Sequence, residues 1–294
     1  RNKFFMAPDA EITIEANPGT LYKEKLEDYL EHGVNRLSLG LQSPQNRELK
    51  ILGRIHTWEE FLESFSLARE AGFSNINIDL MSAIPDQTYE GWEKNLRTVA
   101  ALGPEHISAY SLIVEEGTPF WERDLKLPDE DTEYRMYEDT AAILGEYGVH
   151  QYEISNYAKK GLECRHNKGY WQRTDYLGLG LGASSLVDHI RFSNTDNMEE
   201  YIKNSGQPEK LRCDMERLDE ADEMAEFMFL GLRMTEGVSM DVFEEYFGKK
   251  IESIYGDVLE KYLSIGMLEK KESRIYLTRK GIHVSNGIMA DFLL

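Results

Sequence analysis

Apolar and polar positions repeat with two different periods along the first half of the chain. Residues 12–16 and 34–41 include β-branched residues with apolar ones, which predicts short strands. Between them, apolar residues recur at helical spacing and end at Gly33. Further strands are predicted at 74–80, 106–112 and 149–154, and helices at 58–71, 89–102 and 131–147. Serial repetition of strand and helix predicts an α/β fold, with a parallel sheet closed or partly closed as a TIM-like barrel.

Polar residues stand at or near the carboxyl ends of these predicted strands. Glu15 ends the first strand, Gln42 follows the second, and Asp79 lies near the end of the third. In parallel α/β folds, ligands bind at this end of the strands. Each residue alone is consistent with a solvated loop position, but three at equivalent places in successive units favour a shared site.

The pattern changes near residue 161 and again near residue 216. The alternating Leu and Gly residues at 177–182 predict a strand that another group approaches closely, and their spacing is not that of a dinucleotide fingerprint. Helices are predicted at 219–234, 241–247 and 251–264, followed by a hairpin of 266–271 with 274–278 and a terminal helix. We therefore predict a partial barrel at 1–160, an intermediate sheet-containing segment at 161–215 and a winged-helix-like domain at 216–294.

Composition and charge narrow the function classes. The 294 residues carry a formal net charge of −20, whereas nucleic-acid affinity depends on cationic side chains. The acidic terminal helices favour a structural or docking role over DNA binding. No run approaches the roughly 20 apolar residues of a membrane helix, no signal peptide is visible, and two cysteines give no disulfide framework. These features predict a cytoplasmic protein that is not integral to a membrane. The chain has no initiator Met, and we expect it to begin inside a larger protein.

The segment Cys164–Trp171 concentrates side chains with distinctive chemistry. An imidazole at His166 is able to ligate haem iron, and Tyr170 or Trp171 is able to stack on a planar macrocycle. A zinc site would need three or four ligands, and no others are nearby in the sequence. The alternative is a turn with a hydrogen-bonded histidine and two core aromatics, which the residues alone favour.

Several strings of the sequence occur together in a characteristic order: ITIEANPGTL, GVNRLSLGLQS, LGRIH, NINIDL, HISAYSL with EEGTPF, YEISNYA and CRHNKGYW. In this order they resemble the radical S-adenosylmethionine haem chaperone family (HemW), which is closely related to oxygen-independent coproporphyrinogen III oxidase. The resemblance covers essentially the whole chain. Its specific part is the His-Asn-x-x-Tyr-Trp string, which is implicated in haem binding in the chaperone branch.

The resemblance implies two sets of binding residues. Positions that match contacts to S-adenosylmethionine are Glu15, Gln42, Arg54 and Asp79 and, more loosely on the adenine side, Ile113 and Leu186. Positions that match the haem motif are His166, as the candidate iron ligand, with Asn167, Tyr170 and Trp171. Ala83 and Asp86 stand where the family usually has glycine, so the loop after Asp79 is expected to depart from the usual geometry.

The resemblance also implies a [4Fe–4S] cluster held by a C-x3-C-x2-C loop. Neither Cys164 nor Cys213 fits that loop, and the sequence has no third cysteine. We expect the cluster loop upstream of Arg1, which would mean that this chain lacks the first two strand–helix units and is inactive alone.

The function that the resemblance implies is haem binding and delivery to an acceptor protein, with a membrane-associated haem enzyme among the candidate acceptors. The alternative is coproporphyrinogen III oxidation in porphyrin biosynthesis. The sequence leaves open whether the protein is an enzyme.

Overall fold

The structure, a computed structural model, describes residues 6–294. The chain divides into two compact units, the first ending at Arg165 and the second running from His166 to Leu294. The finer division at 1–160, 161–215 and 216–294 stays a prediction.

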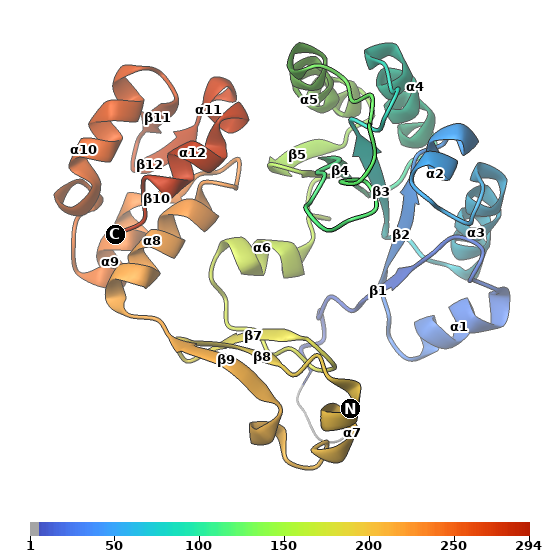
Figure 1. Cartoon of the computed structure of the whole chain (residues 1–294), viewed down its shortest axis with the longest axis horizontal. Helices are drawn as coiled ribbons and strands as arrows, with labels where there is room; N and C mark the ends of the chain where they lie inside the picture. Colours follow the sequence, from blue (N-terminus) through green and yellow to red (C-terminus); the bar gives the residue numbers. More distant parts are fainter. Residues whose placement is uncertain (1–5) are drawn as a thin grey trace. The chain divides into compact units, whose positions relative to one another are not determined.

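The first unit is built on a six-stranded sheet with the order β1-β2-β3-β4-β6-β5 (Figure 1). Strands β1 to β4 are mutually parallel neighbours, so the predicted parallel sheet is confirmed. The elements are β1 (Thr13–Ala16), α1 (Lys23–Glu31), β2 (Arg36–Gln42), α2 (Asn46–Ile51), α3 (Trp58–Ala71), β3 (Ile76–Ser82), α4 (Tyr89–Ala100), β4 (His106–Ser111), α5 (Glu130–Gly145), β5 (His150–Glu153) and β6 (Asn156–Ala158).

The end of this sheet differs from the predicted serial order. The region 149–154 was expected to form one further strand beside the fourth, but the chain turns back after β5. Strand β6 enters between β4 and β5 and pairs antiparallel with both. A strand of only three residues, Asn156–Ala158, is too short to show a period in the sequence.

The two faces of the parallel sheet have opposite chemistry because successive side chains alternate across a strand. One face packs against α1, α3, α4 and α5 and forms the hydrophobic core (Figure 1). Its fully buried strand residues are Leu37, Leu39, Leu41, Ile76, Ile78, Leu80 and Ile107. Burial of each stabilises the fold by about 1.5–3 kcal/mol. The opposite face carries polar residues: Glu15, Arg36, Ser38, Asn77, Asp79, His106 and Ser108.

The second unit holds two three-stranded sheets and several helices. Its elements are α6 (Arg165–Trp171, whose first residue ends the first unit), β7 (Ser184–Val187), β8 (Ile190–Asn194), α7 (Met198–Lys203), η1 (Pro208–Lys210), β9 (Arg212–Arg217), α8 (Glu220–Gly231), β10 (Val238–Ser239), α9 (Met240–Phe247), α10 (Ile251–Ser264), β11 (Leu268–Lys271), β12 (Arg274–Leu277), α11 (Arg279–His283) and α12 (Ser285–Ala290). Helices α8, α9 and α10 followed by the β11–β12 hairpin confirm the predicted winged-helix-like arrangement (Figure 1).

The strand predicted from alternating Leu and Gly residues is wrong. Residues 177–183 form a loop, and β7 begins only at Ser184. A close backbone approach does occur, because a Cβ on Gly178 would lie 2.2 Å from the Ser184 carbonyl oxygen. The three leucines of the loop, Leu177, Leu179 and Leu181, are 61%, 83% and 41% exposed, so no sheet face buries them.

Candidate functional site

The first unit contains a polar cavity of about 350 Å³ towards the carboxyl ends of β1, β2 and β3. Its lining residues are Glu15, Ala16, Asn17, Ser38, Gly40, Gln42, Arg54 and Asp79. Glu15, Gln42, Arg54 and Asp79 were all predicted to contact S-adenosylmethionine, and all four line this cavity. The three strand-end side chains converge because their strands are adjacent and parallel, with Glu15 opposite Ser38 and Leu39 opposite Ile78.

The backbone of β2 shapes the floor of the cavity. Its pairing with β3 is irregular between Leu39 and Gln42, and Gln42 adopts a positive φ of 72°. The Tyr110 hydroxyl donates a hydrogen bond to Gln42 Oε1 at 3.0 Å. A Cβ on Gly40 would meet Gln42 Nε2 at 3.5 Å and Asn17 Oδ1 at 3.7 Å. A larger side chain at position 40 would therefore fill space that the lining residues leave open.

Arg54 reaches the cavity from the turn between α2 and α3. The Arg54 backbone N–H donates to the Leu49 carbonyl at 2.9 Å, and Gly53 before it has a φ of 70°. The capping box of Thr57 with Glu60 fixes the start of α3 three residues later. The turn is thus anchored at both ends. Within the part of the chain that the structure describes, no carboxylate forms an ion pair with the Arg54 guanidinium, which leaves it available to an anionic ligand.

Asp79 is the most deeply placed carboxylate of the cavity. Burial raises the pKa of Asp79, while hydrogen bonds from Asn77 and Ser108 lower it. Asn77 Nδ2 donates to Asp79 Oδ1 at 2.8 Å. Nearby Glu15 raises the pKa of Asp79 further and Arg36 lowers it. In its ionised form this carboxylate is a strong acceptor for hydroxyl groups.

The two looser matches do not join this group. Ile113 lies beyond β4, is 76% exposed and is not among the lining residues of the cavity. Leu186 belongs to β7 of the second unit, where it is buried and forms an isolated bridge with Tyr176. Their role on the adenine side stays a prediction.

The haem motif lies on the helix α6, not in the turn that the residues alone favoured. His166 and Tyr170 are one helical turn apart, and their rings meet edge to face with centroids 4.6 Å apart. The Tyr170 ring in turn meets Tyr176 at 4.7 Å. His166 is exposed, and Asn167 is half-buried beside it. The imidazole therefore stands at the surface next to the Tyr170 ring, which in turn contacts Tyr176.

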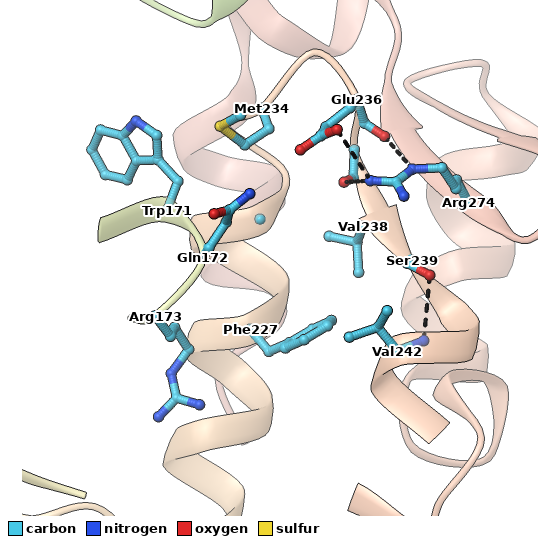
Figure 2. Close-up of a pocket in the computed structure, with 12 residues that line it drawn as sticks. Trp171, Gln172, Arg173, Phe227, Met234, Glu236, Val238, Ser239, Val242 and Arg274 are labelled. Atoms are coloured by element: carbon cyan, nitrogen blue, oxygen red, sulfur yellow. Dashed lines mark hydrogen bonds and ion pairs between the residues drawn. The ribbon is translucent and has the colours of Figure 1, made fainter. Parts of the chain in front are cut away.

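Trp171 closes the motif beside a cavity of about 330 Å³ in the second unit. Figure 2 shows Trp171 and Gln172 on one side of this cavity, with Val238 and Arg274 on the other. The Arg233 guanidinium lies over the Trp171 ring at 4.3 Å from its centroid. Trp171 Nε1 is buried and has no acceptor in the part of the chain that the structure describes.

An ionic cluster beyond Trp171, built around the buried side chains of Arg173, Glu223 and Glu226, was not predicted from the sequence. Arg173 Nε donates to Glu226 Oε2 at 3.0 Å, and the second Glu226 oxygen pairs with Arg191 at 2.6 Å. His189 hydrogen-bonds to Glu223, which also lies 4.0 Å from Arg173. Glu223 and Glu226 are three residues apart on α8 and therefore share one face of that helix. This spacing is the sequence feature from which a paired acidic site could have been predicted. The cluster joins the end of α6 to α8 and to the β7–β8 hairpin.

The metal chemistry of the described residues is limited. Among residues 6–294, no group of three or more His, Cys, Asp or Glu side chains is arranged to hold a metal ion. Cys164 is buried with its Sγ 3.6 Å from Glu11 Oε1, and Cys213 is an exposed free thiol. These residues do not fit a [4Fe–4S] cluster. In the same range, no helix is both long enough and apolar enough to cross a membrane.

Comparison with known proteins agrees with this architecture. The family model of the Radical SAM superfamily matches residues 2–99, and that of the HemN C-terminal domain matches residues 218–284. A solved structure, the radical SAM enzyme coproporphyrinogen III oxidase (HemN) from Escherichia coli, aligns with 99% of this chain and 71% of that chain, at a TM-score of 0.85 and 22% identity. The fold is that of a radical SAM protein with a HemN-type C-terminal domain.

Curated relatives define the family more closely. The heme chaperone HemW of Bacillus subtilis is 38% identical over 288 residues, which covers 97% of this chain and 76% of the relative. The heme chaperone HemW of Escherichia coli is 35% identical over 298 residues, which covers 100% of this chain and 77% of the relative. The chain belongs to the HemW family.

Proposed function

We propose that this chain forms part of a haem chaperone that binds haem at α6, binds S-adenosylmethionine in the polar cavity of the first unit, and delivers haem to an acceptor protein. The observation that carries the proposal is the exposed His166 imidazole, packed against Tyr170 in a chain of the HemW family. A cytoplasmic location and an acceptor among membrane-associated haem enzymes belong to the same proposal.

The surroundings of His166 suit a haem site. A histidine nitrogen is a common axial ligand of haem iron, and the His166 side chain is exposed. Tyr176 adjoins Tyr170 and begins the loop with the exposed residues Leu177, Leu179 and Leu181. Exposed leucine side chains offer apolar area that a porphyrin would bury on binding. Asn167 and Trp171 would support the ligand from the same helix.

S-adenosylmethionine fits the donors and acceptors of the first cavity. Glu15 and Gln42 offer partners for the methionyl amine, and Arg54 offers a partner for the carboxylate. Asp79 would accept hydrogen bonds from ribose hydroxyls. Acidic groups on one side and a guanidinium without an ion pair among the described residues match the zwitterionic end of this ligand. The described residues hold no cluster ligands, and no reaction step through a cluster follows from them.

The test is a haem titration of the wild-type chain and of His166→Ala, read by affinity and by the position of the Soret band. The proposal expects weaker binding and a shifted band in the variant, because the axial ligand is lost. His32→Ala, at another exposed histidine, serves as the control and should behave as wild type. Equal affinity and an identical spectrum in His166→Ala would remove the imidazole from the proposed site.

Coproporphyrinogen III oxidation is the rival activity. The likeness to HemN at 22% identity describes the fold and does not favour that reaction here. Turnover of coproporphyrinogen III by cluster-reconstituted full-length protein, together with no stable haem binding, would favour the rival.

A further inference from the structure

The polar face of the first sheet carries an unbroken chain of hydrogen bonds between Tyr152 on β5 and Asp79 in the cavity. Tyr152 Oη lies 2.9 Å from His106 Nε2, and His106 Nδ1 lies 2.6 Å from Asn77 Oδ1. Asn77 Nδ2 then lies 2.8 Å from Asp79 Oδ1 and 2.8 Å from Ser38 Oγ. Four strands of the sheet therefore contribute to one polar connection.

The donors of this chain all point the same way. Burial and the Arg36 guanidinium lower the pKa of His106 well below its ordinary value, so the imidazole is neutral. Since Asn77 donates through Nδ2, its Oδ1 accepts from His106 Nδ1–H, and His106 Nε2 accepts from the Tyr152 hydroxyl. Each donor polarises the next, and the series ends on the Asp79 carboxylate.

The sheet register holds these groups in place. His106 is the backbone partner of Asn77, and Ser108 is the backbone partner of Asp79. His106 and Asn77 are 0% and 2% exposed, so water does not substitute for a lost partner without rearrangement. Ser108 Oγ lies 3.2 Å from Asn77 Oδ1 and shares its single hydrogen between this oxygen and Asp79. A buried polar series with every link made is rigid.

The outer end of the series lies next to the haem motif in the sequence. The backbone of Cys164 hydrogen-bonds to the Tyr152 hydroxyl and lowers its pKa against the larger effect of burial. Cys164 directly precedes α6 and stands two residues before His166. The hydrogen bonds thus run from the cavity of the first unit to Cys164, the residue directly before the haem-motif helix.

We propose that Tyr152, His106 and Asn77 form a positioning relay that holds the Asp79 carboxylate for hydroxyl groups of the cavity ligand and links its state to Cys164. None of the three relay residues lines the cavity; Asn77 reaches it through two lining residues, Asp79 and Ser38. This inference rests on the proposed function for the identity of the ligand, but the relay itself is measurable without ligand.

The charged groups around Asp79 set the sign of the expected effect. Glu15 on β1 opposes ionisation, Arg36 on β2 favours it, Arg54 lines the same cavity, and Tyr110 on β4 interacts electrostatically with Asp79. The substitutions Asn77→Ala and Tyr152→Phe, which interrupt the relay, replace none of these groups. Loss of the Asn77 hydrogen bond removes an interaction that stabilises the carboxylate, so the pKa of Asp79 must rise.

The test is a pH titration of the Asp79 side-chain carboxyl by carbon NMR in ligand-free protein, with the signal assigned from Asp79→Asn. Asn77→Ala should raise the pKa of Asp79 by about one to two, from the loss of one hydrogen bond to a charged group. Tyr152→Phe, which keeps the ring, should raise it by roughly a few tenths, because only polarisation through His106 is lost. Tyr157→Phe, at a buried tyrosine outside the relay, should leave it unchanged.

The Cys164 amide resonance supplies the second readout. It should follow the Asp79 titration in wild type and stop following it in Tyr152→Phe. An Asp79 pKa that Asn77→Ala leaves unchanged, or that Tyr152→Phe and Tyr157→Phe shift equally, overturns the relay. A Cys164 amide that never follows Asp79 overturns the link to the haem-motif segment.

Affinity for S-adenosylmethionine separates this inference from the proposed function. If the relay holds, the pH at which affinity falls to half on acidification should move upward in Asn77→Ala, in step with the Asp79 pKa. A shifted Asp79 pKa in a chain that does not bind S-adenosylmethionine would support the relay and refute the proposed ligand. Binding of S-adenosylmethionine that depends on Arg54, together with an Asp79 pKa that Asn77→Ala does not shift, would support the proposed ligand and refute the relay.

Discussion

Replacement of Arg54 by Ala tests the proposed cavity most simply. The Arg54 guanidinium lines the cavity, and no ion pair within the described residues occupies it. A hydrogen-bonded ligand carboxylate at this position is worth about 1.5–3 kcal/mol, the usual contribution of a hydrogen bond to a charged group. Arg54→Ala should therefore weaken S-adenosylmethionine binding by roughly 10- to 150-fold, since about 1.4 kcal/mol corresponds to a tenfold change.

Isothermal calorimetry with two ligands makes this assay specific. S-adenosylmethionine carries the carboxylate, whereas 5′-methylthioadenosine keeps the adenosine and thioether but lacks the amino-acid end. Arg54→Ala should reduce affinity for the first ligand only. Arg54→Lys should fall between, because an ammonium keeps the charge but not the planar fork. Arg47→Ala is the matched control, since Arg47 forms a surface ion pair with Asp86 at 3.4 Å. Equal affinity of wild type and Arg54→Ala for S-adenosylmethionine would refute the assignment.

Three further predictions concern the same unit. Gly40→Val should abolish measurable S-adenosylmethionine binding by calorimetry while the melting temperature changes little, because the new side chain would enter the cavity near Gln42 Nε2; unchanged affinity would mean that the ligand lies elsewhere. Ala83 has a φ of 56°, so Ala83→Gly should raise the free energy of unfolding by up to about 1 kcal/mol, and a destabilised variant in urea unfolding would contradict this. Because the pKa of Asp79 is raised in the folded protein, protonation of this side chain stabilises the fold. This stabilisation is complete below the ordinary pKa of 3.8 and is lost as the pH rises through the raised pKa. Asp79→Asn should therefore be more stable than wild type at pH 7 and not at pH 3, and equal stability at both would show that burial of the carboxylate is tolerated without cost.

The sequence predicted the parts of the fold that depend on local periodicity. Alternation in β2 and β3 buries Leu37 and Ile76 on one face and directs Ser38 and Asn77 to the other. The grouping of Glu15, Gln42 and Asp79 followed from their equivalent positions at strand ends. Arg54, in a turn between helices, has no such periodicity and was found only through the family resemblance.

Features set by contacts distant in the sequence were not predictable in this way. The loop with Leu177 and Gly178 alternates like a strand, but the backbone approach of Ser184 decides its conformation. Helix α6 was not predicted because it is short and contains Gly169, Asn167 and two aromatic residues, all of which have weak helix propensity. The positive φ of Gln42 depends on the irregular pairing of β2 with β3. Ala83 and Asp86 both have positive φ, which explains why glycine suits these two positions.

The central claim is that one chain offers separate sites for S-adenosylmethionine in the polar cavity and for haem on α6. Both ligands should be titrated against the same two variants, Arg54→Ala and His166→Ala. Arg54→Ala is expected to lose affinity for S-adenosylmethionine and to keep wild-type haem affinity, while His166→Ala is expected to show the opposite pattern. Loss of both affinities in either variant, at an unchanged melting temperature, would contradict two separate sites.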